Sequence, residues 1–175
     1  MWFRIDLSGI ELQIQIKHYE PSVQDRWDCQ WCDVDFSFQS GTWLQYKKED
    51  DEVLLSCEVE ELTDLIDGLL NDRMSEVKEV AMIEPDFVYV FHPKRDLRLD
   101  PKYTYVREGY EIADIYLEWK VFFWNEGLTD NYLRVVLDRQ EMEYLRNYLW
   151  YIMGKLKFDS PEIKELVEKN MLYRL

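Results

Sequence analysis

Glycine, proline and cysteine are scarce in this sequence, which has 6, 5 and 3 of them among 175 residues. With so few Gly and Pro residues, no segment has the composition of a flexible linker between domains. Three cysteines cannot all pair, and structural disulfides are rare in the reducing cytoplasm. These shortages predict one domain over residues 1–175 and a cytoplasmic location.

Long apolar runs are also missing. No run approaches the ~20 apolar residues that a membrane-spanning helix needs. The first residues, MWFRIDLSGI, lack the basic start and apolar core of a secretory signal peptide. We therefore expect no membrane partner.

Basic residues are outnumbered, with 21 Lys and Arg against 36 Asp and Glu and a net charge of −15. The excess is concentrated in residues 49–86, where 14 acids accompany only Arg73 and Lys78. An acidic field repels nucleic-acid backbones and attracts basic partners. We expect no nucleic-acid partner, although solubility alone also explains such a charge.

Catalytic motifs are absent. The sequence has no phosphate-binding loop, nucleophile elbow or dinucleotide fingerprint. Asp33 and Asp35 share one strand face with Trp31 as a possible carboxylate site, but an acid-rich chain produces such pairs by chance. The sequence therefore predicts neither an enzyme nor a cofactor.

The stretch WDCQWC, residues 27–32, is the main candidate for metal or redox chemistry. Cys57 with His18 or His92 could complete a four-ligand zinc set with Cys29 and Cys32. Reactive pairs of this spacing, however, gain their reactivity at a helix N-terminus. Here the pair begins an alternating strand, whose residues three apart point to opposite faces. We favour Cys32 as a core residue and predict no metal.

Alternation of apolar and polar residues predicts several strands. Residues 10–18, IELQIQIKH, alternate throughout, and Ser8-Gly9 offers a turn for a hairpin over residues 2–17. The pattern continues in residues 31–39. Further strands are predicted at residues 42–46, 53–59, 80–84, 86–92, 103–108, 112–124 and 131–138, with a charged loop at residues 47–52.

Helical spacing predicts two principal amphipathic helices and a short C-terminal helix. The first spans residues 59–73. The second begins after Asp138, where Glu141 at the third helical position completes a capping box. Ser160-Pro161 then begins the last helix. Strands and helices separated in this way predict an α+β fold with a mainly antiparallel β-sheet.

The segment 93–102, PKRDLRLDPK, is a small basic island in the acidic chain. It has too few charges to outweigh the acidic field and bind nucleic acid. We expect it either to neighbour the acidic surface or to form a solvated loop.

Several motifs, in this order, resemble the WapI-type immunity proteins of bacterial polymorphic-toxin systems. They are the WDCQWCDVDF stretch, a Gly-x-Trp turn, an acidic-start helix, the stretch IEPDFVYVF and a final strand and helix. The residues that carry the resemblance are Trp27, Asp28, Trp31, Gly41, Trp43, Glu84, Pro85 and Phe87, together with residues 59–73 and 132–156. The resemblance covers most of residues 10–156, and residues 93–110 and those after 157 lie outside its pattern.

The resemblance implies a cytoplasmic antidote that binds a cognate toxin domain. Many such toxins are nucleases, and nuclease domains tend to be basic because they hold phosphate backbones. A concentrated acidic surface could steer fast encounter with such a domain. The charge distribution favours two binding segments, the loop of Glu49, Asp50, Asp51 and Glu52 and the helix face of Glu60, Glu61, Asp64 and Asp67.

Two other interpretations remain open at this point. The chain could be a non-catalytic acidic interaction module of another pathway, with its charge serving solubility. It could also be a small zinc protein that uses Cys29, Cys32 and Cys57.

Overall fold

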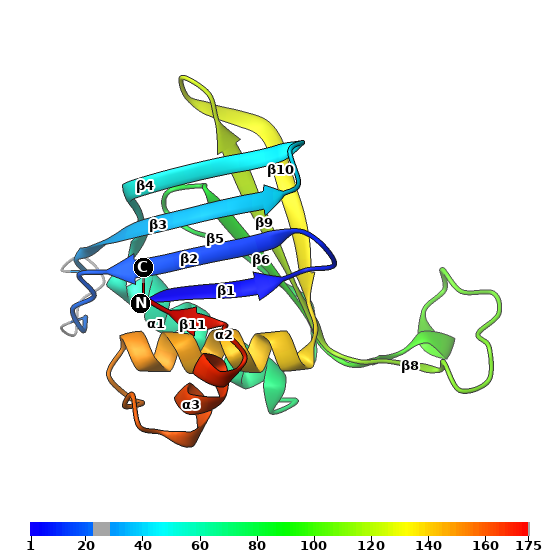
Figure 1. Ribbon diagram of the computed structural model, residues 1–175. Coiled ribbons are helices and arrows are strands. Elements are labelled where there is room, and N and C mark those ends of the chain that lie inside the picture. Colours follow the sequence, from blue (N-terminus) through cyan, green and yellow to red (C-terminus); the bar gives the residue numbers. More distant parts are fainter. Residues whose placement is uncertain (23–28, 175) are drawn as a thin grey trace.

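The computed structural model describes residues 1–22 and 29–174 and has an α+β architecture (Figure 1). Among these residues, two main antiparallel sheets carry most of the strands, and three α-helices gather at one end of them. The predicted fold class is therefore confirmed, with two principal helices and a short C-terminal one.

The first sheet has the strand order β11-β1-β2-β3-β4. Its strands are β1 (Trp2–Asp6), β2 (Glu11–Lys17), β3 (Trp31–Ser40), β4 (Leu44–Leu55) and β11 (Leu172–Tyr173). In β2, Leu12, Ile14 and Ile16 are buried while the residues between them are only partly buried. The predicted hairpin is present, with Phe3 opposite Ile14.

The second sheet has the order β10-β9-β6-β5. Its strands are β5 (Lys78–Ala81), β6 (Phe87–His92), β9 (Tyr116–Trp124) and β10 (Leu128–Leu137). Leu117, Trp119 and Val121 of β9 are buried, as their alternation predicts. β4 and β5 each end one of these orders, so that among the described residues each has one edge without a partner strand.

Aromatic side chains join the two sheets. The rings of Phe36 on β3 and Phe87 on β6 lie 5.0 Å apart, and those of Tyr46 and Phe123 lie 4.9 Å apart. The Trp124 backbone N–H also donates a 3.1 Å hydrogen bond to the Tyr46 hydroxyl. Aromatic pairs of this kind add about 0.5–1.5 kcal/mol each beyond the area that they bury.

The helices close the other end of the core. α1 (Ser56–Leu70) buries its apolar face, and α2 (Arg139–Ile152) begins with the predicted capping box of Asp138 and Glu141. From α2, Tyr148 stacks on Phe3 with 4.9 Å between ring centroids, and its hydroxyl accepts a hydrogen bond from the Ile16 backbone. α3 (Pro161–Glu168) starts with proline, as predicted. Side chains of both sheets and all three helices share one core cluster.

The prediction of a charged loop at residues 47–52 is wrong, because these residues belong to β4. β3 pairs with β4 at Lys47, Lys48, Asp51 and Glu52, and a register shift between Val34 and Phe36 accommodates Glu49 and Asp50. Asp50 has a left-handed φ of 50°, and its backbone N–H donates a 2.8 Å hydrogen bond to the Asp35 carboxylate. Lys47, Glu49, Asp50 and Glu52 are exposed on this edge strand, a position where charges also discourage unwanted strand pairing, whereas the side chain of Lys48 is only 18% exposed.

The strand predicted at residues 103–108 is also wrong. Residues 93–114, which we name the arm, project from the rest of the molecule (Figure 1). The arm contains a two-stranded ribbon of β7 (Arg95–Asp96) and β8 (Ile112–Ala113) and the 3₁₀ helix η2 (Leu97–Leu99). Residues 103–108 lie between them without a partner strand, so their β-favouring composition has nothing to pair with.

Other element boundaries differ by a few residues. α1 starts at Ser56, so residues 56–58 belong to a helix and not to the predicted strand. Glu58 begins this helix by accepting a 2.9 Å hydrogen bond from the Leu55 backbone N–H. β5 covers Lys78–Ala81 instead of residues 80–84, and residues 112–124 divide between β8 and β9.

Candidate partner-binding surface

The acidic residues predicted to bind a partner lie on two consecutive elements. Glu49, Asp50, Asp51 and Glu52 lie on the edge strand β4, and Glu60, Glu61, Asp64 and Asp67 lie on α1, which follows it. We name these eight residues the acidic surface. The structure describes all of them and shows that they differ in what they contact.

On β4, three of the four acids have cationic partners. The ammonium groups of Lys47 and Lys17 lie 2.6 Å from the carboxylates of Glu49 and Asp50, respectively. The hydrogen bond from Lys17 holds the pKa of Asp50 below its usual value. Asp51 pairs with Lys48. Glu52 is exposed and has no ion-pair partner in the described part of the chain.

On α1, Glu60 and Asp67 contact other segments. The Glu60 carboxylate accepts hydrogen bonds from the Tyr19 hydroxyl at 2.8 Å and from the backbone and hydroxyl of Ser22. Burial of this carboxyl favours its neutral form, but the hydrogen bonds outweigh that effect and lower its pKa. Asp67 pairs with Arg73 at 2.5 Å and with Arg146 of α2 at 3.2 Å.

Glu61 and Asp64 complete the helical part of the acidic surface. The Glu61 carboxylate lies 3.6 Å from the Lys78 ammonium of β5. Asp64 is exposed, and no ion pair or hydrogen bond of its side chain occurs within the described residues. Within residues 1–22 and 29–174, Asp64 and Glu52 are therefore the exposed acids of this surface that have no ion-pair partner.

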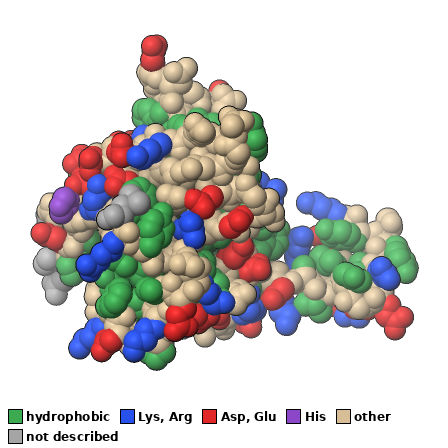
Figure 2. All heavy atoms as spheres, viewed as in Figure 1, with side chains coloured by type: hydrophobic (Ala, Val, Ile, Leu, Met, Phe, Trp, Pro, Cys, Tyr) green, Lys and Arg blue, Asp and Glu red, His purple; other side chains and the backbone are tan. Residues whose placement is uncertain are grey.

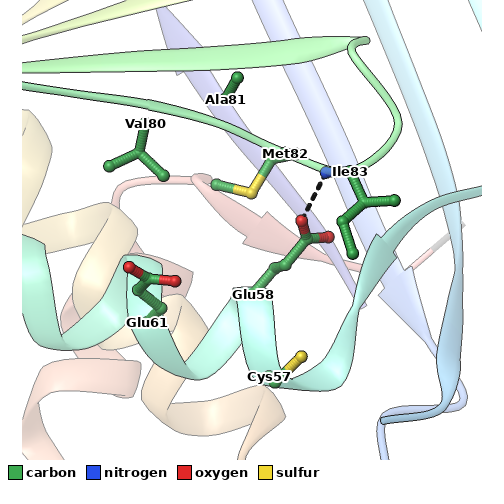
Figure 3. A pocket seen from close by; sticks show the side chains of 7 residues that line it. All are labelled: Cys57, Glu58, Glu61, Val80, Ala81, Met82 and Ile83. Carbon is green, nitrogen blue, oxygen red and sulfur yellow. Dashed lines mark hydrogen bonds between the residues drawn. The ribbon is translucent and has the colours of Figure 1, made fainter. Parts of the chain in front are cut away.

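A cavity of about 360 Å³ borders the acidic surface (Figure 3). Cys57, Glu58 and Glu61 of α1 line one side of it. The segment from Val80 to Ile83 lines the other side. The Glu58 carboxylate connects the two sides by accepting a 2.6 Å hydrogen bond from the Ile83 backbone N–H, drawn as a dashed line in Figure 3. An apolar wall beside carboxylates suits a side chain with an apolar stem and a cationic end.

A buried ion pair between the sheets was not predicted from the sequence. The Lys48 ammonium lies 2.9 Å from a carboxylate oxygen of Asp86, whose side chain is 1% exposed. It also lies 4.7 Å from the centre of the Trp124 ring. Burial raises the pKa of Asp86, and the Lys48 ammonium opposes that rise. Burial disfavours the charged form of Lys48, but its hydrogen bonds to Asp51 and Asp86 outweigh this and raise its pKa.

The second candidate site, Asp33 and Asp35, is also part of the architecture. Asp35 is buried, and one of its carboxylate oxygens lies 2.8 Å from the Lys17 ammonium. The Asp33 carboxylate lies 2.5 Å from the ring of His18, which is exposed at the end of β2. Both carboxylates therefore connect β3 to β2 or to the residue that follows it. In the sequence, only the alternation of residues 31–39 indicated that the two share one strand face.

Of the three cysteines, Cys32 is a core residue, whereas Cys29 and Cys57 are partly buried. Cys32 is fully buried on β3, and burial raises the pKa of its thiol to about 12. Burial and a hydrogen bond with Cys29 raise the pKa of the Cys57 thiol to about 12. His92 ends β6 and stacks on Tyr116. Across residues 1–22 and 29–174, no group of three or more His, Cys, Asp or Glu side chains could hold a metal ion.

The basic island of residues 93–102 forms part of the arm, and most of its charge is neutralised there. Arg98 pairs with Asp96 at 2.5 Å, and Arg95 pairs with Asp100 at 3.3 Å.

Within the described part of the chain, no helix has the length and apolar composition needed to cross a membrane.

Comparison with known proteins gives one result at the level of families. The model of the immunity protein WapI-like family matches residues 3–157. A comparison with curated proteins gave no match. The matched range covers Trp31 at the start of β3, Gly41 and Trp43 between β3 and β4, and Phe87 on β6. Two further residues of the predicted motif, Trp27 and Asp28, lie outside the described residues.

Proposed function

Because this chain belongs to the WapI-like immunity protein family, we propose that it binds a cognate toxin domain and neutralises it in the cytoplasm of the producing cell. The observation that carries this proposal is the family match over residues 3–157. The role is one of binding and not of catalysis. We further propose that residues 1–175 act as one domain, since the sheets and helices share one core cluster.

We propose that the toxin domain is basic, as a nuclease domain is, and that the acidic surface guides it to the antidote. The net charge of −15 creates a field that attracts such a domain from a distance. Complementary charge of this kind mainly accelerates association. Asp64 and Glu52 contribute most directly, because their carboxylates face solvent without a neighbouring cation among the described residues.

The cavity beside Glu61 forms a pocket at the border of the acidic surface. A partner Lys or Arg side chain could place its apolar stem against Val80 and Ile83 and its charge near Glu61. Such a contact would add specificity to an otherwise long-range attraction.

A rescue assay tests the proposed function. The C-terminal domain encoded by the large reading frame beside this gene would be expressed with and without this chain, and surviving cells would be counted. We expect the domain to kill cells on its own, the chain to restore growth, and the two proteins to purify together. Toxicity that the chain does not relieve would contradict the proposal.

Charge reversal tests the role of the acidic surface. We expect Asp64→Lys and Asp67→Lys to slow association with the toxin domain and to reduce its dependence on salt, because both remove attraction. Glu162→Lys on α3 is the matched control, because it changes the net charge by the same amount outside the acidic surface and should slow association less than the α1 variants do. Association rates that stay at the wild-type level in both α1 variants would exclude this surface.

A further inference from the structure

The arm exposes an unusual amount of apolar surface for a segment of a soluble chain. Five of its large side chains are exposed: Leu99, Tyr103, Tyr105, Tyr110 and Ile112. Leu99 is 82% exposed and Tyr105 is 79% exposed. Figure 2 shows hydrophobic side chains, coloured green, on the surface of the projecting part of the molecule. Exposed apolar patches of this kind mark interaction sites in monomeric proteins.

The arm holds its own shape. Next to the β7–β8 ribbon the Leu97 backbone N–H donates a 2.7 Å hydrogen bond to the Glu111 carbonyl, and the Arg98 guanidinium binds both oxygens of Asp96. At its base, Asp114 lies 2.9 Å from the guanidinium of Arg139 at the start of α2. A segment that is ordered before binding loses less conformational entropy when a partner covers it.

The five exposed apolar side chains of the arm have no role in the core. The core cluster and the partly buried residues packed against it include no residue between His92 and Ile115. Two strands paired as a short ribbon are only marginally stable in water. Neither the body of the protein nor the ribbon therefore accounts for side chains such as Leu99 and Tyr105.

The charges of the arm indicate what kind of partner covers it. Residues 93–114 contain five basic and five acidic residues. Arg95 and Arg98 are neutralised within the arm, and Arg107 lies over the Tyr110 ring at 5.4 Å. Such a segment offers little to a polyanion, and the net charge of −15 repels anionic membranes. A convex, neutral and tyrosine-rich projection fits an apolar cleft in another protein, where Tyr side chains often dominate affinity.

We propose that the arm inserts Leu99 and Tyr105 into an apolar cleft of the toxin domain and supplies most of the affinity of the complex. This inference rests on the proposed function. The acidic surface brings the partner close, and the arm then slows its dissociation. Association depends on salt because it follows the net charge, whereas dissociation does not, because the contact at the arm is apolar.

The double variant Leu99→Ser/Tyr105→Ser tests the inference. The probe is the C-terminal domain encoded by the large reading frame beside this gene. We expect its dissociation rate to rise at least about 30-fold, because hot-spot side chains contribute 2 kcal/mol or more. We expect the association rate to stay within about twofold. Phe158→Ser removes an aromatic side chain that is 53% exposed outside the arm, and this control should leave both rates unchanged.

The possible outcomes are distinguishable. A double variant that dissociates at the wild-type rate overturns the inference and leaves the proposed function intact. A wild-type chain that does not bind the domain overturns both. The inference is also overturned if the double variant keeps full toxin binding but loses self-association in sedimentation velocity, or loses binding to phosphatidylglycerol vesicles.

Discussion

The acidic surface and the arm use their side chains in opposite ways. Most acids of the acidic surface contact cations or backbone groups of the same chain, as Asp67 does with Arg73 and Arg146. The large apolar side chains of the arm, such as Leu99 and Tyr105, are left outside the core. The surface that was prominent in the sequence thus serves partly to hold the structure together. The arm, whose sequence shows only a small basic island, presents exposed apolar side chains that do not contribute to the core.

This difference teaches that a run of charges is a poor list of binding residues. Paired acids still contribute to the long-range field, because that field follows the net charge of −15. A close contact with a partner, by contrast, depends on exposed side chains that are not already in contact with other parts of the same chain. We therefore expect substitutions of buried or paired residues in the body to change mainly stability, and substitutions of the exposed apolar residues in the arm to change mainly the dissociation of the partner.

The largest difference in the free energy of unfolding is expected when a tyrosine is replaced by serine, once in the body and once in the arm. Tyr89→Ser removes a fully buried ring that stacks on Trp119, and it should lower the free energy of unfolding by about 3–5 kcal/mol. Tyr105→Ser in the arm should change it by less than about 0.5 kcal/mol. Urea unfolding followed by circular dichroism measures both. Similar losses in the two variants would show that the arm is part of the cooperative core.

The next largest effect should come from the ion pair between the sheets. Lys48→Met leaves the buried Asp86 carboxylate without its cation and should lower the free energy of unfolding by about 3 kcal/mol. Lys47→Met is the control, because Lys47 is exposed and its ion pair within the described residues is with exposed Glu49. Its expected loss in the same urea experiment is below about 0.5 kcal/mol. Equal stabilities of the two variants would mean that the buried pair has no structural role.

A smaller, pH-dependent effect is expected at Glu60. Hydrogen bonds hold its pKa below the usual value of 4.5, so its ionised form stabilises the folded state above that pH. The stabilisation is lost as the pH falls through the lowered pKa. Glu60→Gln should cost about 1 kcal/mol at pH 7. This difference from the wild type should shrink below pH 4.5 in thermal unfolding measured across pH. A difference independent of pH would rule out the charge as its source.

The smallest effects separate the acids of α1 from one another. Asp67→Asn weakens ion pairs to Arg73 and Arg146 and should lower the free energy of unfolding by about 0.5–1 kcal/mol. Asp64→Asn should leave stability unchanged, since no cation contacts Asp64 in the part of the chain that the structure describes. Chemical unfolding of both variants in parallel checks this order. A larger loss of unfolding free energy in Asp64→Asn than in Asp67→Asn would contradict our view that Asp67 stabilises the fold and Asp64 does not.

Much of the fold could be predicted because local patterns carry it. Alternation identified β2 and β9, and the Asp138 and Glu141 capping box identified the start of α2. These signals depend on neighbours in the sequence and on one buried face. The family could be predicted for a similar reason, since its motifs are short and occur in a recognisable order.

The errors arose where contacts between distant residues decide the structure. Residues 47–52 have the composition of a loop but pair with β3, and Lys48 reaches Asp86 across the core. Residues 103–108 have the composition of a strand but lie in the arm with no strand beside them. The candidate site was affected in the same way, because the sequence shows which residues are acidic but not which of them already have partners.

Hydrogen exchange of the complex would test the account most directly. In the free chain, backbone amides of residues 97–112 should exchange faster than those of the core strands, because their hydrogen bonds lie within a solvent-exposed segment that has no part in the core cluster. When the toxin domain binds, we predict strong protection of residues 97–112 and weaker protection at the solvent-facing side of α1. A stable complex in which exchange in the arm stays at its free rate would contradict the account.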